Sequence, residues 1–326
     1  METATERTER GGSGGAGSAA RSRAGLLALV AAVYTYALVV FGGIVRITGS
    51  GMGCGEDWPR CNGQWIPAFT FETTIEYTHR LLAAGIGMVV LGVLGYAFMK
   101  RSTPGMAGRG GLLRPFGLAA ALFVLQALLG AVTVRLELPT HVTVAHFIMA
   151  MLFIATLIVA AVRAGVFGEV GSAGTPDPLA KRAAMWAFTT AAVGLIVVAF
   201  GAVTANTPGS PPACTGFPLC SGSLLPPAGA VPAEIHWAHR VAAFTLLFVS
   251  LAAALAAHRS RSPSPVRRAA WTAVGLIIAQ LVVAAVLVLM ALPPVLQALH
   301  LAVGAAVWFA LVVWSAQARR AVTGMA

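Results

Sequence analysis

Long apolar stretches separated by short polar segments dominate the pattern of this chain. Eight of them are long enough to cross roughly 30 Å of hydrocarbon as helices. They cover about residues 25–45, 80–99, 115–134, 141–162, 183–205, 235–257, 270–292 and 295–316. Every backbone amide inside a bilayer needs an internal partner, and a helix supplies one. The pattern therefore predicts an all-α integral membrane protein with eight transmembrane helices.

Composition supports a location in the bilayer and suggests how the chain is oriented there. With 58% hydrophobic and 10% charged residues, the chain is too apolar to stay soluble in water. If both termini are cytoplasmic, most of the 22 Lys and Arg residues fall on the inner side, as the positive-inside rule requires. The net charge of +11 then reflects orientation, and no nucleic-acid partner is expected. We expect a disordered cytoplasmic tail at 1–24, a cytoplasmic linker at 166–182 and a cytoplasmic tail at 319–326.

A set of Cys, His, Gln and Pro residues recurs about 155 to 160 positions apart. The correspondences are Cys54, Cys61, His79 and Arg80 with Cys214, Cys220, His239 and Arg240, and Gln126, Pro139 and His146 with Gln280, Pro293 and His300. Four helices in each half give both copies the same membrane orientation. The sequence thus predicts a tandem repeat of two four-helix bundles, at 25–165 and 183–318.

All four cysteines lie in the two long outer loops. Their short spacing and their repetition favour one disulfide within each loop, Cys54 with Cys61 and Cys214 with Cys220. Free thiols and redox cycling of a pair remain alternatives. A zinc site is less favoured, because the spacing is not that of common zinc ligands.

Four histidines lie near the outer ends of the even-numbered helices at one common depth. They are His79, His146, His239 and His300. Two imidazoles that face each other inside a four-helix bundle can supply both axial ligands of a haem iron. The alternative for each is a hydrogen bond to a neighbouring helix. Because a polar group in lipid is costly, four in register favour two haem sites. His141 and His258 are weaker candidates.

Two further pairs of polar residues accompany these histidines. Arg80 and Arg240 follow His79 and His239 directly, and their guanidinium groups suit the carboxylates of haem propionates. The alternative is that each arginine extends to the lipid headgroups. The buried glutamines Gln126 and Gln280 are expected to hydrogen-bond between helices.

The two halves differ three residues before their first histidine. That position is Glu76 in the first half and His236 in the second, on the face of the helix that carries the histidine. A carboxylate at a porphyrin edge can stabilise developing positive charge or move protons. The alternative is that Glu76 caps the first turn of its helix, where the helix dipole favours an acid.

Taken together, these motifs resemble the bacterial haem A synthase family over residues 25–316. The resemblance rests on Glu76-x-x-His79-Arg80, His146, His236-x-x-His239-Arg240, His300 and the paired cysteines. It implies that His239 and His300 bind a haem b cofactor in the second half. It implies that the first half receives haem O as substrate near His79 and His146, with Glu76 as catalytic residue. A disulfide or redox role for Cys54 and Cys61 is also implied.

The implied reaction converts haem O to haem A for cytochrome oxidase. The C8 methyl group becomes a formyl group by successive hydroxylations. Expected partners are membrane lipid, the haem O synthase and an unidentified electron donor, in the plasma membrane of a bacterium; the oligomeric state is left open, a homo-oligomer included. The competing hypothesis is a dihaem electron-transfer cytochrome or a haem carrier that leaves the porphyrin unaltered. A transporter built from parallel repeats is a third and weaker hypothesis.

Overall fold

The structure is a computed structural model that describes residues 4–170 and 178–323, with only the backbone helix described for residues 4–16. Its helices are α1 (Ala4–Ile47), α2 (Phe71–Met99), α3 (Leu113–Arg135), α4 (Thr140–Arg163), α5 (Pro178–Asn206), α6 (Val231–Arg259), α7 (Ser264–Leu289) and α8 (Pro294–Thr323), with a short 3-10 turn η1 (Ser50–Met52). All eight α-helices are long and apolar enough to cross a membrane. The predicted class, an all-helical multi-pass membrane protein, is confirmed.

Several helices begin before their apolar stretch does. Helix α2 starts at Phe71, nine residues earlier than expected, because the Thr70 side chain accepts a hydrogen bond from the Thr73 amide at 3.2 Å. The first turns of this helix are polar, so hydrophobicity alone does not reveal them. As a result His79 and His239 lie about 12 Å along their helices and His146 and His300 about 9 Å.

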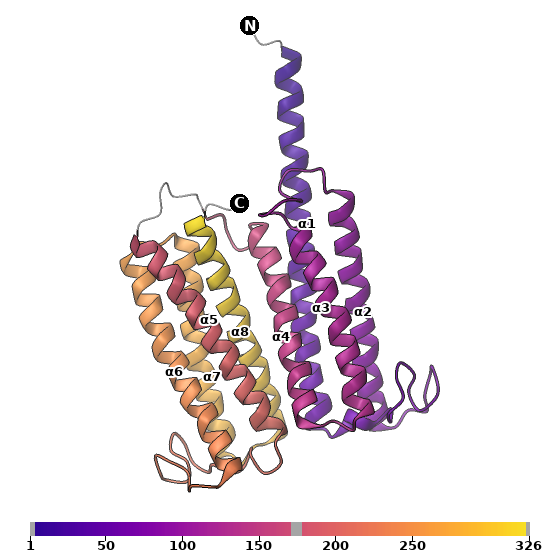
Figure 1. Cartoon of the computed structure of the whole chain (residues 1–326), viewed down its shortest axis with the longest axis vertical. Coiled ribbons are helices and arrows are strands. Elements are labelled where there is room, and N and C mark those ends of the chain that lie inside the picture. The colour runs from indigo at the N-terminus through magenta and orange to yellow at the C-terminus, as the bar shows by residue number, and fades with distance from the viewer. Residues whose placement is uncertain (1–3, 171–177, 324–326) are drawn as a thin grey trace.

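The terminal and linker predictions need correction. Residues 4–24 are not disordered, because α1 runs unbroken from Ala4 and extends beyond the bundle in Figure 1. Its Ala24 is fully buried in an apolar cluster, and Arg21 Nη2 donates to the Arg163 carbonyl at 2.6 Å. Residues 178–182 of the expected linker belong to α5, and residues 319–323 of the expected tail belong to α8. The remaining parts, 1–3, 171–177 and 324–326, lie outside the described residues.

The helices form two four-membered rings that lie side by side (Figure 1). In the first, α1 packs on α2 and α4, and α3 packs on α2 and α4; in the second, α5 to α8 pack in the same order. The rings meet through α4 against α8, flanked by α1 against α8 and α4 against α5. If the two halves exchange places, the contact of α1 with α8 becomes the contact of α5 with α4, and the reverse. The tandem repeat stays a prediction, and this packing pattern agrees with it.

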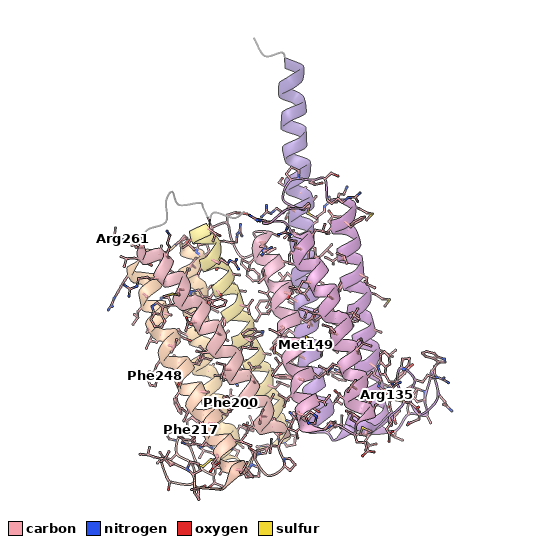
Figure 2. The ribbon with its side chains drawn as sticks, viewed as in Figure 1. Arg135, Met149, Phe200, Phe217, Phe248 and Arg261 are labelled. Carbon is pink, nitrogen blue, oxygen red and sulfur yellow. A yellow bond between two sulfur atoms is a disulfide. The ribbon has the colours of Figure 1, made fainter. Side chains whose placement is uncertain are left out.

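The short turns of the two halves share a backbone conformation. Glu137 and Leu138 between α3 and α4 have φ values of 57° and 60°, and Ala291 and Leu292 between α7 and α8 have 58° and 64°. These turns lie at the same end of the bundle as the long cysteine-containing loops. Figure 2 shows Arg135 and Phe217 at this end and Arg261 at the other.

Apolar side chains cover the outside of the rings as well as the seam between them. Phe248 on the outer surface of α6 is 65% exposed (Figure 2), as expected for a side chain that faces lipid. At the seam Trp308 is buried and donates its indole N–H to the Met151 carbonyl at 2.9 Å. The Tyr36 hydroxyl donates to the Ala302 carbonyl at 3.0 Å across the same seam. The two histidine sets are therefore fixed relative to each other.

Candidate functional site

In the second ring, α6 and α8 bring two imidazoles together. The ring centres of His239 and His300 are 6.5 Å apart, and the ring planes are inclined by 81°. These helices stand diagonally across the ring, since each packs on α5 and α7. The predicted pair of the second half therefore meets inside its bundle.

This geometry fits an iron porphyrin between the two rings. An iron bound by two imidazoles needs about 4 Å between the ring nitrogens, and so roughly 6 Å between ring centres. The buried Nδ1 of His239 has no hydrogen-bond partner. Among the described residues, no three His, Cys, Asp or Glu side chains gather as a metal site, so His239 and His300 form a pair and not part of a larger cluster. A macrocycle that supplies the other four ligands matches such a pair.

The first ring holds its own pair on α2 and α4. His79 stacks on Phe41 of α1, with ring centres 6.2 Å apart and planes inclined by 17°. His146 lies on α4, which stands diagonally across the ring from α2, since each packs on α1 and α3. Its buried Nδ1 lacks a partner, as that of His239 does. The described geometry thus places all four predicted histidines in the interior of the rings, two in each.

The predicted glutamines reach these histidines from the neighbouring helices. Gln126 Nε2 of α3 lies 3.1 Å from His146 Nε2, and Gln280 Nε2 of α7 lies 3.1 Å from His300 Nδ1 and 2.9 Å from the His300 carbonyl. The Oε1 atoms of both glutamines are buried without a partner. Each glutamine therefore restrains one imidazole of its half and keeps one acceptor unused.

Glycines leave the space that the imidazoles fill, and these were not predicted from the sequence. A Cβ on Gly42 of α1 would lie 3.1 Å from His79 Nε2, and one on Gly201 of α5 would lie 3.0 Å from His239 Cε1. Both are tighter than ordinary contacts. The available signal was the recurrence of these two glycines at nearly the same offset as the histidines.

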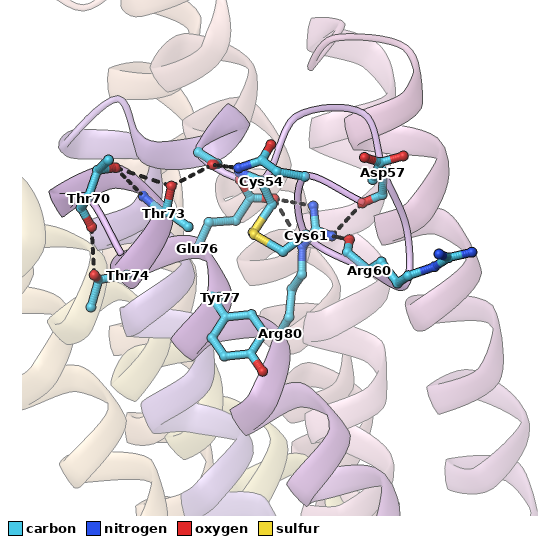
Figure 3. Close-up of a disulfide and its surroundings, with 12 residues drawn as sticks. Cys54, Asp57, Arg60, Cys61, Thr70, Thr73, Thr74, Glu76, Tyr77 and Arg80 are labelled. Atoms are coloured by element: carbon cyan, nitrogen blue, oxygen red, sulfur yellow. Dashed lines mark hydrogen bonds and ion pairs between the residues drawn. A yellow bond between two sulfur atoms is a disulfide. The ribbon is translucent and has the colours of Figure 1, made fainter. Parts of the chain in front are cut away.

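Glu76 is buried near the N-terminal end of α2, where it joins the helix to the first cysteine loop (Figure 3). Its Oε1 accepts hydrogen bonds from Arg80 Nε and Nη2 at 3.1 and 2.5 Å, and its Oε2 accepts the Cys54 amide at 2.8 Å. Only 3% of the residue is exposed. Thr70, and not Glu76, caps the helix, so the alternative role at the helix start is wrong.

The two arginines bind loop carbonyls. Arg80 Nη1 donates to the carbonyls of Asp57 and Arg60 at 2.6 and 2.7 Å. The second arginine has more such bonds: Arg240 Nη1 donates to Gly216, Pro218 and Leu219 at 2.9, 3.3 and 2.7 Å, and Nη2 donates to Cys214 at 2.7 Å. Its buried Nε has no partner. Contact with haem propionates stays a prediction for both.

The loops themselves are closed by disulfides between Cys54 and Cys61 and between Cys214 and Cys220, the pairing that the repeat favours. All four cysteines are buried. At the position of Glu76, the second half has the buried His236, whose Nδ1 lies 3.1 Å from the Ser210 carbonyl. His141 and His258 are exposed and lie outside both pairs.

Known proteins match this chain across both rings. A profile of the family described as "Cytochrome oxidase assembly protein" matches residues 25–73 and 66–312. A relative from Symbiobacterium thermophilum named "Heme A synthase" is 31% identical over 269 residues, covering 80% of this chain and 84% of that protein. Relatives of the same name from Bacillus licheniformis and Geobacillus kaustophilus are each 30% identical, covering 75% and 77% of this chain and 78% and 77% of their own lengths.

The matched residues include both histidine pairs, Glu76 and both cysteine loops. Family membership and site geometry therefore concern the same part of the chain. On this evidence the chain belongs to the cytochrome oxidase assembly protein family.

Proposed function

We propose that this protein is a haem A synthase of a bacterial plasma membrane, which oxidises the C8 methyl group of haem O to the formyl group of haem A. Relatives named "Heme A synthase" over most of the chain support the reaction. The observation that carries the assignment within the site is the inequality of the two histidine pairs. A buried carboxylate, Glu76, accompanies the first pair, and an imidazole, His236, takes its place in the second.

In this proposal the second ring holds haem b as a resident cofactor and the first ring receives haem O. His239 and His300 would hold the cofactor, since their imidazole centres lie 6.5 Å apart inside the second ring. Haem b bound there supplies one-electron transfer. His79 and His146 would hold the iron of haem O and so orient its porphyrin ring.

Glu76 acts on the reacting edge of the substrate. Its carboxylate is fixed by Arg80 on one oxygen and by the Cys54 amide on the other, so it cannot rotate away from the histidine face of α2. A fixed negative charge stabilises positive charge that develops at the methyl carbon, and a carboxylate can accept the proton that leaves it. Two successive hydroxylations, with O2 as the oxidant and the donor's electrons as the reductant, convert the methyl group to a geminal diol, and loss of one water leaves the formyl group.

The rival hypothesis of an electron-transfer cytochrome or haem carrier is less favoured. It leaves a carboxylate beside the histidines of only one half unexplained. We also propose that both termini are cytoplasmic, that haem O arrives within the bilayer from haem O synthase, and that a membrane or outer-surface donor supplies electrons. The greasy side chain of haem O favours delivery through the lipid.

The test replaces Glu76 by Gln in the full chain, co-expressed with a source of haem O. We expect Glu76→Gln to retain bound haem and to lower the yield of haem A at least about tenfold, because the fixed charge is lost. Glu72→Gln is the matched control, since Glu72 is an exposed acid on the first turn of the same helix.

Extracted haems identified by mass decide the outcome. Haem A or hydroxylated haem O beside haem b supports the synthase. Undiminished haem A in the Glu76→Gln protein removes Glu76 from the mechanism. A wild-type protein that carries haem b alone, despite a supply of haem O, favours the carrier.

A further inference from the structure

The two equivalent arginines differ in what balances their charge. Arg80 gives its Nε and Nη2 atoms to the carboxylate of Glu76, four residues earlier on α2. Arg240 has His236 at that position, and its Nε has no hydrogen-bond partner. Within residues 4–170 and 178–323, no carboxylate forms an ion pair with Arg240, which is only 7% exposed.

The surroundings of Arg240 supply dipoles but no negative charge. Four loop carbonyls accept its Nη hydrogens. The acid nearest in sequence, Glu234, accepts the Gly229 amide at 2.9 Å instead. A buried cation without a counter-charge is costly, and a carboxylate brought by a ligand would offset that cost. At Arg80 the protein already provides this carboxylate.

From this difference we propose that the two sites hold haem for different lengths of time. Arg240 holds a propionate of the haem in the second ring, so that this haem stays bound. Glu76 competes for Arg80, so that the haem of the first ring can leave. The inference rests on the proposed function, in which the second haem is a cofactor and the first is a substrate. A cofactor must stay through many turnovers, and a product must dissociate in each one. One residue position, Glu76 or His236, would set both properties.

Haem release from the wild-type protein gives the first test, and it needs no variant. The purified full chain is loaded with haem b at both sites, and excess apomyoglobin captures the haem as it dissociates. We expect two phases of release. Loading instead with haem b dimethyl ester, which lacks both free carboxylates, should accelerate the slow phase by about tenfold or more and change the fast phase by less than about threefold.

Variants at the deciding position give the second test. His236→Glu places a carboxylate four residues before Arg240, so we expect it to accelerate the slow phase by about tenfold. His236→Gln is the control that removes the imidazole without adding charge, and it should leave the slow phase within about threefold. Glu76→Gln should slow the fast phase, because Arg80 is then available to a propionate. The absorption spectrum of the bound haem checks that each variant retains its histidine ligands.

The outcomes separate this inference from the function on which it rests. If the wild-type chain binds no haem through either histidine pair, the proposed function fails. A chain that binds haem and forms haem A, but whose two phases respond equally to esterification, refutes only the difference between the arginines. Equal acceleration by His236→Glu and His236→Gln would refute it as well.

Discussion

The imidazole of His300 is held from the neighbouring helix by a single amide. Gln280 Nε2 lies within hydrogen-bond distance of both the ring and the backbone carbonyl of His300. A partner of this kind fixes the ring orientation of a ligating histidine, and its loss commonly weakens metal binding. The glutamines are thus positioning residues for these imidazoles.

Gln280→Leu should therefore weaken haem b binding by about tenfold to a hundredfold, with little change in the amount of folded protein. Titration of the purified protein with haem b, followed by absorbance, measures this. Gln317→Leu is the control, since it also removes a buried amide of this half but one that bonds to the Phe167 carbonyl. Equal affinity in both variants would show that Gln280 does not position His300.

At the scale of single residues, the sequence indicated most of the reactive side chains but few of the hydrogen bonds between them. The four histidines, the pairing of the cysteines and the inequality of Glu76 and His236 all follow from the repeat. The ion pair of Glu76 with Arg80 was not predicted, although the spacing of four residues on one helix could have indicated it. The carbonyls around Arg240 were not, because they depend on the path of a loop that no periodic pattern encodes.

At the scale of helices, α5 affects the second histidine pair through a glycine. Gly201 faces His239 closely enough that a Cβ would lie 3.0 Å from the imidazole. A larger side chain must push the ring away or push the two helices apart. Helix packing and the position of the His239 imidazole therefore depend on the same contact.

Gly201→Val should lower haem b occupancy at least about tenfold, because the displaced imidazole no longer faces His300. The measurement is the haem content of protein purified in equal amounts. Gly275→Val serves for comparison, since a Cβ on this glycine of α7 meets nothing within 4 Å. If the two variants bind haem alike, Gly201 does not set the position of His239.

Helix ends were the least predictable feature at this level. The polar first turns of α2 and the long upstream part of α1 carry no apolar signal, so hydrophobicity placed their starts too late. Capping by Thr70 and burial of Ala24 by tertiary contact decide these ends instead. Such contacts are known only once the neighbouring segments are in place.

For the whole molecule, composition and length were sufficient to predict eight membrane helices, but not how they pack. Lipid tails are as apolar as leucine side chains, so the pattern does not say which face of a helix meets another helix. The seam between α4 and α8 is a result of such packing. The depth of the histidines was predicted only approximately, because it depends on where each helix begins as well as on the rise per residue.

Orientation in the membrane can be checked through the cysteines. Both disulfides lie at the end of the bundle that we assign to the outer surface, and no described cysteine is a free thiol. In intact cells, a membrane-impermeant maleimide should therefore label this protein only after mild reduction of the disulfides.

A variant with all four cysteines changed to serine and with Ser260→Cys, in the turn between α6 and α7, completes this experiment. It should react only after the cells are made permeable. Labelling of Ser260→Cys in intact cells would show that the topology is the reverse of the one proposed.

The matching contacts on the two sides of the seam have a consequence for the evolution of the chain. Contacts of α1 with α8 and of α4 with α5 change places when the halves are swapped, as in the interface of a two-fold homodimer. If an ancestor consisted of two separate identical subunits, one codon specified both the position of Glu76 and that of His236. Division of labour between the two haems then became possible only after gene duplication and fusion had freed those positions to diverge.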